Sequence, residues 1–194
     1  YTVDGILFYY NEYTNDTTLV RCPTKKTIRE YTIPENVTIL GTSAFRDNIS
    51  LTSVSLPDGL ITIRNYAFQG CTGLSTLSIP DTVTSIGEYA FEKCTGLTYV
   101  YLGKSLTSIG YHAFYQCSNI ITIVIPDALT SVDKYSFEST NIRKVILPAS
   151  VTSFNGTIRD LSSISIFESE NTTNVGYYTV DGILFYYNEY TNDT

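Results

Sequence analysis

The stretch IPDTVTSIGEYAFEKCTGLTYVY, residues 79–101, decides the fold because closely similar stretches stand on both sides of it. In LPDGLITIRNYAFQGCTGLSTLS, residues 56–78, the apolar, Gly and Cys positions and the Ala-Phe pair fall in the same places. The complete copies are 23 residues long, except the last, which has 22. The other copies start at Ile33, Leu102 and Ile125, with a degenerate sixth from Leu147. Repeats of this length predict a solenoid, a rod of stacked coils.

Apolar residues recur at fixed positions of every copy. One coil cannot bury its own apolar face, but stacked coils can, because equivalent residues then lie over one another. The columns are Phe45, Phe68, Phe91, Phe114 and Phe137; Ala44, Ala67, Ala90, Ala113 and Ser136; Leu40, Ile63, Ile86, Ile109 and Val132; Leu51, Leu74, Leu97, Ile120 and Ile142; and Val54, Leu77, Val100, Ile123 and Val145. These columns predict continuous ladders through one core.

Each copy also predicts its own local structure. The segment LTSVSL, residues 51–56, has the alternation of a short strand. Pro57 lacks an amide hydrogen and ends that strand or places it at an edge. The GxxAFxxC segment predicts one or two helical turns that pack Ala and Phe inward. We therefore expect a solenoid with a parallel sheet on one face and short helical turns on the other.

The repeat IPxxVTSIGxxAFxxCxGLTxVxL resembles the BspA-type leucine-rich repeat, also called the Treponema pallidum type. The resemblance is strong over residues 33–147 and weak over 148–167. Members of that family occur largely on bacterial and protozoan cell surfaces, where they are associated with adhesion. The resemblance therefore implies a leucine-rich-repeat surface protein at an extracellular or cell-surface location. A shared fold does not by itself establish function.

The residues before the first coil do not follow the 23-residue repeat. From Val3 to Pro23 the sequence predicts a β-hairpin: a strand, a polar turn at NEYTND, and a second strand. BspA-type proteins often carry a similar hairpin between blocks of repeats. We divide the chain into a hairpin and lead-in (1–32), six coils (33–167), and a connection that starts the next unit's hairpin (168–194).

The chain ends with the same seventeen residues with which it begins. YTVDGILFYYNEYTNDT occupies residues 1–17 and again 178–194, an offset of 177. One explanation is a native array of units of this length, either one long chain or an end-to-end filament. The other explanation is that the ends of the chain were chosen at convenient loops, or that the copy was joined on by design. We expect the strand Val180–Tyr187 to be unpaired and to seek a partner in the following residues or in another molecule.

Composition and charge narrow the range of possible functions further. The 194 residues are 43% hydrophobic, which suits one folded domain, and the absence of Met indicates a mature segment or an excerpt. The net charge is −7 and the 12 Lys and Arg do not cluster. The charge therefore disfavours nucleic acid and anionic membrane surfaces as partners. No apolar run approaches the roughly 18 residues of a membrane span.

Residues that could carry chemistry are few. Cys71, Cys94 and Cys117 form one column, which suits either a metal or redox ladder or buried thiols that cap the turns. Vertical disulfides are conceivable, but three thiols in a row cannot all pair. His112 stands in a column of Tyr, which favours a surface aromatic row over a catalytic base. No catalytic motif is present, so we expect no enzyme, no metal site and no cofactor.

Two sets of surface residues remain as candidate sites. The N-x-S/T sequons are glycan acceptors on exposed turns if the source is eukaryotic and secreted, and carry no glycan if it is bacterial. They are at Asn15, Asn36, Asn48, Asn155, Asn171 and Asn192. The exposed positions of the sheet give a candidate partner-binding face at Thr76, Tyr99, Tyr101 and Thr122, unless that face is an ordinary solvated sheet.

The favoured function is a non-catalytic extracellular structural protein, a tandem array or filament of units of about 177 residues. Its partners would then be copies of itself, end to end. The alternative is a cell-surface adhesin or receptor that binds a protein or a glycan through the exposed sheet face.

Overall fold

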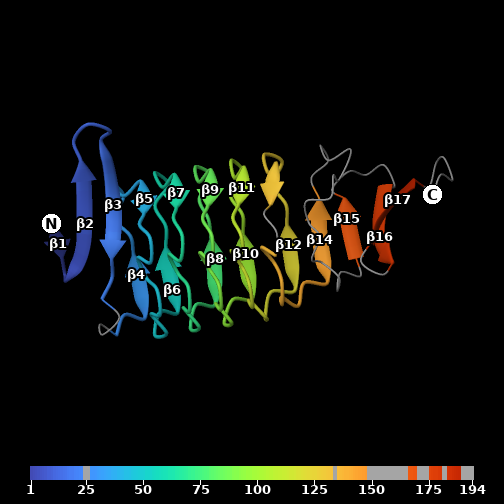
Figure 1. Ribbon diagram of the computed structural model, residues 1–194, viewed down its shortest axis with the longest axis horizontal. Helices are drawn as coiled ribbons and strands as arrows, with labels where there is room; N and C mark the ends of the chain where they lie inside the picture. The colour runs from blue at the N-terminus through green and yellow to red at the C-terminus, as the bar shows by residue number, and fades with distance from the viewer. Residues whose placement is uncertain (24–26, 133–134, 148–165, 170–174, 181–182, 189–194) are drawn as a thin grey trace.

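The computed structural model describes residues 1–23, 27–132, 135–147, 166–169, 175–180 and 183–188. The chain winds into a β-solenoid whose coils follow one another along the long axis (Figure 1). The N-terminal hairpin lies at one end of the rod and the last two strands lie at the other. None of the described ranges holds a helix long and apolar enough to cross a membrane.

One face of the solenoid is an eight-stranded sheet with the order β1-β2-β3-β5-β7-β9-β11-β13. From β3 onward its strands pair in parallel, and each coil repeats the register of the one before, as in Thr62↔Ser85 and Ile63↔Ile86. The strands are β1 (Thr2–Val3), β2 (Ile6–Asn11), β3 (Asp16–Arg21), β5 (Ile39–Leu40), β7 (Thr62–Ile63), β9 (Ser85–Ile86), β11 (Ser108–Ile109) and β13 (Ser131–Val132).

The opposite face carries the strands that the LxxVxL segments predicted. They are β4 (Glu30–Thr32), β6 (Ser53–Ser55), β8 (Thr76–Ser78), β10 (Tyr99–Tyr101), β12 (Thr122–Val124), β14 (Lys144–Leu147) and β15 (Ile166–Ser169). They pair in parallel as β4-β6, β8-β10 and β12-β14-β15. In each of β8 and β10 the middle residue points inward, so Leu77 and Val100 are buried. The solenoid and its parallel sheet are thus confirmed.

The expected helical turns are wrong: the described residues contain no helix. In the coil 79–101 the amide N–H groups of Tyr89 and Phe91 donate to Tyr111 and Ala113 of the next coil, at 2.9 and 2.7 Å. Tyr89 and Lys93 have positive φ, 55° and 58°, which a right-handed helix does not allow. The segment is a run of tight turns whose alternate amides form a further ladder between coils. A helix would have used those amides within its own coil.

The predicted core columns are confirmed, and the phenylalanine column is a continuous stack. Successive ring centroids lie 5.1, 5.3, 5.1 and 5.2 Å apart from Phe45 to Phe137, with the ring planes nearly parallel. The four rings from Phe45 to Phe114 have no exposed surface, and Phe137 is 3% exposed. This stack and the apolar columns around it form one core along the length of the rod.

The hairpin expected between Val3 and Pro23 is also confirmed, since β2 and β3 pair antiparallel. A two-residue turn at Asp4 and Gly5, both with positive φ, adds the short edge strand β1.

The C-terminal strand is paired, contrary to expectation. β16 (Val175–Val180) and β17 (Ile183–Asn188) pair antiparallel. We expected Val180–Tyr187 to lack a partner because residues before Tyr178 were assigned to a connection. Those residues instead start β16, so β17 has a partner along one edge.

Candidate functional site

The predicted partner-binding face lies on three strands of the second face, β8, β10 and β12. Thr76 on β8 pairs directly with Tyr99 on β10, and Tyr101 follows on the same side two residues later. The Tyr99 side chain is 56% exposed, so a large amphipathic ring stands above the sheet. Thr122 is half-buried on β12.

Two exposed apolar residues also belong to this face: Val124, which the sequence predicts to face solvent, and Ile121, which it does not. Ile121 is 56% exposed and Val124 is 37% exposed, and both belong to or adjoin β12. We call Tyr99, Tyr101, Ile121, Thr122 and Val124 the Tyr99 face. The run IITIV at residues 120–124 was the available signal, since it has no polar residue except Thr where earlier coils carry Ser or Thr.

Tyr101 is held in place by its neighbours. Its hydroxyl donates to Oδ1 of Asp81 at 2.8 Å, and Nζ of Lys104 lies 3.2 Å from Oδ2 of the same carboxylate. The backbone N–H of Lys104 also donates to Asp81, and this bond, followed by the Tyr101 hydroxyl, lowers the pKa of the carboxyl. Asp81 thus ties two coils together and fixes one ring of the Tyr99 face.

The cysteine column consists of buried thiols. Sγ of Cys71, Cys94 and Cys117 donates to the carbonyl of Phe45, Phe68 and Phe91 respectively, at 3.0 to 3.1 Å. Burial raises the pKa of Cys71 and Cys117 to about 12 and raises that of Cys94 as well. Metal binding and nucleophilic attack need thiolates. The geometry therefore favours the capping role over the redox ladder, and no disulfide joins these three thiols.

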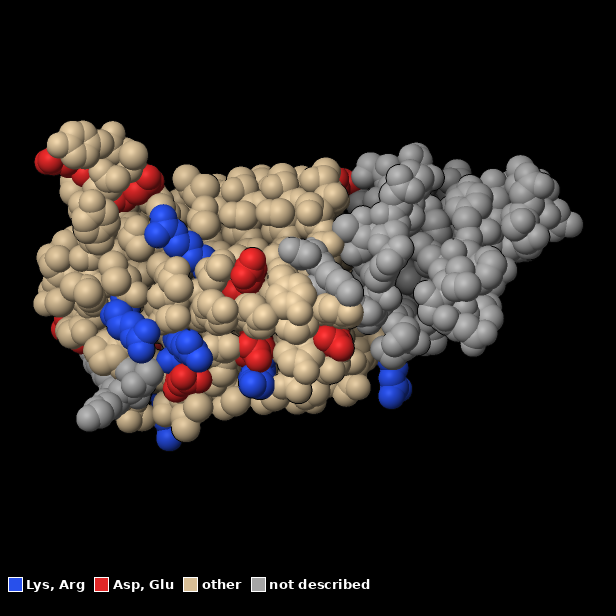
Figure 2. All heavy atoms as spheres, in the orientation of Figure 1, with Lys and Arg blue, Asp and Glu red and all other residues tan. Residues whose placement is uncertain are grey.

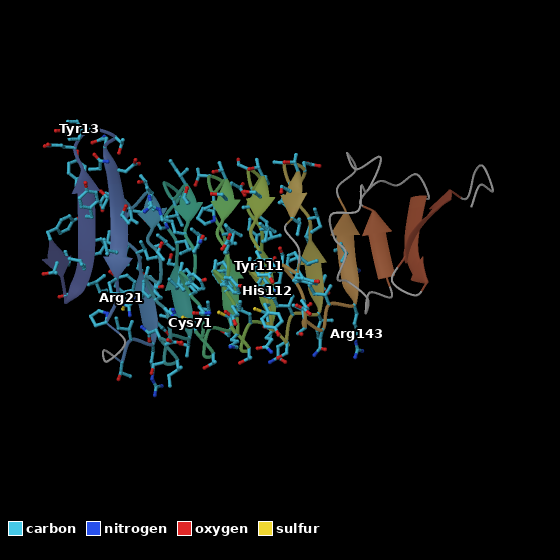
Figure 3. All side chains as sticks on the ribbon, viewed as in Figure 1. Tyr13, Arg21, Cys71, Tyr111, His112 and Arg143 are labelled. Carbon is cyan, nitrogen blue, oxygen red and sulfur yellow. The ribbon has the colours of Figure 1, made fainter. Side chains whose placement is uncertain are left out.

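His112 packs within an aromatic row, as its column predicted. Its ring stacks on Tyr111 and Tyr115, with centroids 4.0 and 4.5 Å away, and Nε2 lies 3.3 Å from a carboxylate oxygen of Glu138. Figure 3 shows Tyr111 and His112 together midway along the rod, away from the hairpin tip at Tyr13. Only 15% of the His112 side chain is exposed. Within the part of the chain that the structure describes, no three His, Cys, Asp or Glu side chains are placed to hold a metal.

The sequons differ in accessibility. Asn15 and Asn36 are exposed, so both remain candidate acceptors. Asn48 is 2% exposed and its amide donates to Sγ of Cys22, so its prediction as an exposed acceptor is wrong. The reason is that Asn48 occupies the cysteine column of the first coil and faces the core. Asn155, Asn171 and Asn192 lie outside the described residues.

The charged side chains show no concentration of one sign on the visible face. Figure 2 shows Lys and Arg interspersed with Asp and Glu over the coils, with a few acidic residues near the tip of the hairpin. Nucleic acid needs a basic surface. The described residues on this face form no such surface.

The family model described as the BspA type leucine-rich repeat region matches residues 38–165, in six copies. The chain belongs to the BspA-type leucine-rich repeat family. The match covers the parallel coils and the Tyr99 face, which is part of this repeat fold. None of the curated proteins compared with the chain matches it.

Solved structures agree with the BspA-type assignment. The leucine-rich repeat protein of T. pallidum is 24% identical with a TM-score of 0.75, over 85% of this chain and 80% of that one. A leucine-rich cell surface protein of Faecalibacterium prausnitzii is 26% identical with a TM-score of 0.64, over 93% of this chain. The BspA-type chain spans 58% of the length of the Faecalibacterium protein. The pneumococcal vaccine antigen PcpA, 18% identical with a TM-score of 0.52 over 94% of this chain and 39% of that one, shares the fold.

Proposed function

We propose that this BspA-type chain is a non-catalytic structural segment of a tandem array with units of about 177 residues, located outside the cell or on its surface. The observation that carries the proposal is the register of the two terminal copies. Thr2↔Leu7 and Val3↔Ile6 pair at the start of the chain. Thr179↔Leu184 and Val180↔Ile183, the same residues one offset later, pair at its end.

The second copy is also in the right place for a continuing rod. β16 begins at Val175, upstream of the copied segment, and lies beside β15 of the preceding coil (Figure 1). β16 therefore connects the last coil with the strand β17, the copy of β2. A surface location is supported by the likeness to the cell surface protein of F. prausnitzii.

Reading the source transcript beyond the codon for Thr194 tests the array. The proposal expects the reading frame to continue with Thr-Leu-Val-Arg-Cys-Pro, the residues that follow Thr17 in the first copy. Electron microscopy of the native material should then show fibres with an axial repeat of roughly 30–40 Å, since coils stack about 4.8 Å apart. A transcript that ends or diverges after Thr194 would show that the array is wrong.

The Tyr99 face supports a second candidate function, adhesion to a protein or a glycan. Tyr99 and Ile121 are each 56% exposed. The double variant Tyr99→Ser/Ile121→Ser should weaken adhesion to the partner surface about tenfold or more, because exposed aromatic and apolar anchors carry most of such binding energy. The melting temperature should stay unchanged.

A matched control is available on the same face of the solenoid. Ser53 and Ser55 on β6 are exposed two coils before Tyr99 and Tyr101, at the equivalent positions. Replacing both with Ala should leave adhesion unaltered. If the Tyr99→Ser/Ile121→Ser variant adheres as well as the parent chain, the face is an ordinary solvated sheet surface.

A further inference from the structure

We propose that the Tyr99 face binds an uncharged N-acetylhexosamine oligosaccharide on the surface of another cell. The inference rests on the proposed adhesion through this face and deepens it, because it selects a glycan over a protein and names the class of sugar. The site adds Thr76 and Ser78 of β8 to the Tyr99 face. The neighbouring strands β8, β10 and β12 then present a hydroxyl row, an aromatic row and an aliphatic row, in that order (Figure 1).

The aromatic row is a platform for a sugar ring. Tyr99 is 56% exposed, and Tyr101 is held by the hydrogen bond from its hydroxyl to Asp81. The two tyrosines are two residues apart on one strand, so their Cα atoms lie about 7 Å apart. The face of an aromatic ring carries negative partial charge. It therefore attracts the polarised C–H groups on the flat side of a pyranose ring.

The hydroxyl row lies along one side of this platform. Thr76 pairs with Tyr99, and Ser78 pairs with Tyr101. Thr76 and Ser78 are exposed, and in the described part of the chain neither hydroxyl is hydrogen-bonded to another group. A hydroxyl both donates and accepts hydrogen bonds, as the hydroxyls of a sugar do. This row therefore matches the polar edge of a sugar ring.

The aliphatic row lies along the other side of the platform and selects the kind of sugar. Ile121 is 56% exposed and Val124 is 37% exposed. A plain hexose would place hydroxyls against these side chains, whereas the acetamido group of an N-acetylhexosamine ends in a methyl group. Burying that methyl group on Ile121 and Val124 stabilises the complex. The hydroxyl and aliphatic rows are two coil spacings apart, about 10 Å, which one sugar ring and its acetamido group can bridge.

The charge of the site matches that of an uncharged ligand. Charged residues make up 16% of the chain but are absent from four successive strand segments of this face. Those segments are residues 51–56, 74–79, 97–102 and 120–125. Protein partners bind mainly through Trp, Tyr and Arg, while Ser and Thr are under-represented among their anchors. Two tyrosines beside free hydroxyls, without Arg, therefore favour a neutral glycan over a protein or an anionic ligand.

An open face of this kind holds a short glycan weakly. We expect a Kd of about 1 mM for a trisaccharide, because only one stacked ring and a few hydrogen bonds offset the cost of association. Sites repeated along an array would gain avidity by about 10²–10⁴-fold. A weak single site is therefore sufficient for adhesion by the proposed array, and the assay must detect millimolar binding.

The first experiment compares chitotriose with cellotriose as probes for the whole chain. The two trisaccharides share one backbone, and chitotriose carries acetamido groups where cellotriose carries hydroxyls. In saturation-transfer NMR, the acetamido methyl and ring C–H protons of chitotriose should receive the most saturation from the protein. Chitotriose should bind about tenfold more tightly than cellotriose, because only its methyl groups cover Ile121 and Val124.

Single variants test each row. Tyr99→Ser should weaken chitotriose binding about tenfold or more, because it removes the platform. Thr76→Val, which removes only a hydroxyl, should weaken it about threefold to tenfold, the equivalent of one hydrogen bond. Ile121→Ser should abolish the preference for chitotriose over cellotriose. Ser53→Ala/Ser55→Ala, two coils before the platform, is the matched control and should bind chitotriose as the parent chain does.

The outcomes separate the glycan site from the adhesive function. A parent chain that does not bind chitotriose, or binds it no better than cellotriose, would overturn the proposal, as would equal binding by Tyr99→Ser. If Tyr99→Ser/Ile121→Ser still loses adhesion in that case, the adhesive face stands and its partner is a protein. Conversely, chitotriose binding that Tyr99→Ser loses, with unchanged adhesion of the double variant, would support the glycan site and overturn its role in adhesion.

Discussion

At the scale of single residues, each ring of the phenylalanine stack should contribute strongly to the stability of the core. Phe91 has no exposed surface, and its ring lies 5.3 Å from Phe68 and 5.1 Å from Phe114. Phe91→Ala should lower the free energy of unfolding by about 3–5 kcal/mol, since it removes a large buried ring and leaves a cavity. Denaturant titration measures this. Tyr13→Ala, at a 91% exposed turn, should change it by less than about 0.5 kcal/mol.

The buried thiols make stability depend on alkaline pH. The pKa of Cys117 is raised to about 12 in the folded protein, above the ordinary value of 9.0. Between these values the unfolded state loses the proton and the folded state keeps it. The free energy of unfolding should therefore fall as pH rises above about 9, by up to about 1.4 kcal/mol per pH unit for this thiol.

Cys117→Ser isolates that thiol, because a hydroxyl can still donate to Phe91 but does not titrate in this range. Its free energy of unfolding, measured from about pH 8 to about pH 11, should fall less steeply than that of the parent chain. Thr98→Ser, an exposed change that keeps a hydroxyl bonded to Ser75, should leave the slope unaltered. Identical slopes for Cys117→Ser and the parent would contradict the assignment.

At the scale of the element, close approach between coils depends on glycine. A Cβ on Gly96 would lie 2.5 Å from the carbonyl oxygen of Thr72 and 2.8 Å from that of Leu74, both in the preceding coil. Gly96→Ala should lower the free energy of unfolding by about 1–3 kcal/mol, because the two coils must move apart. Gly59→Ala is the control, since its Cβ would meet nothing closer than 3.4 Å. Equal effects in thermal melts would show that coil spacing is not the cause.

At the scale of the whole molecule, the rod should tolerate the loss of one entire coil. Deleting Ile79–Tyr101 joins Ser78, the last residue of β8, to Leu102, the first residue of the next coil. The junction repeats the one in the parent chain, where β10 ends at Tyr101 directly before Leu102. Each coil contacts only its neighbours, so the shortened chain should still unfold cooperatively, with a lower free energy of unfolding. Circular dichroism melts and size-exclusion chromatography measure this.

Deleting only residues 79–90 is the matching negative control. This deletion removes β9, one strand of the eight-stranded sheet, but keeps β10 on the opposite face. The remaining part of the coil then has a strand on one face only. Ladders on both faces then lose register, and we expect aggregation or an unfolded spectrum. A folded product from this deletion would contradict the coil as the unit of stability.

Sequence periodicity was enough to predict the strands on the second face and the columns of the core. The coil strands of the eight-stranded sheet on the first face were missed because β7 and its equivalents are two residues long, too short for alternation to be visible. The candidate face was predicted at Tyr99 and Tyr101. Ile121 was missed because apolar residues in a strand are normally assigned to the core.

What the sequence by itself determined is the repeat, the buried columns and the family, because all three depend on which residue types recur every 23 positions. The tertiary structure alone decided that the turns are not helical, that Asn48 faces inward, and that Val175–Val180 pairs with the copied strand. These three depend on hydrogen bonds and burial that form only when the coils and strands pack together. Local propensity cannot show whether an amide will bond within its own coil or to the next one.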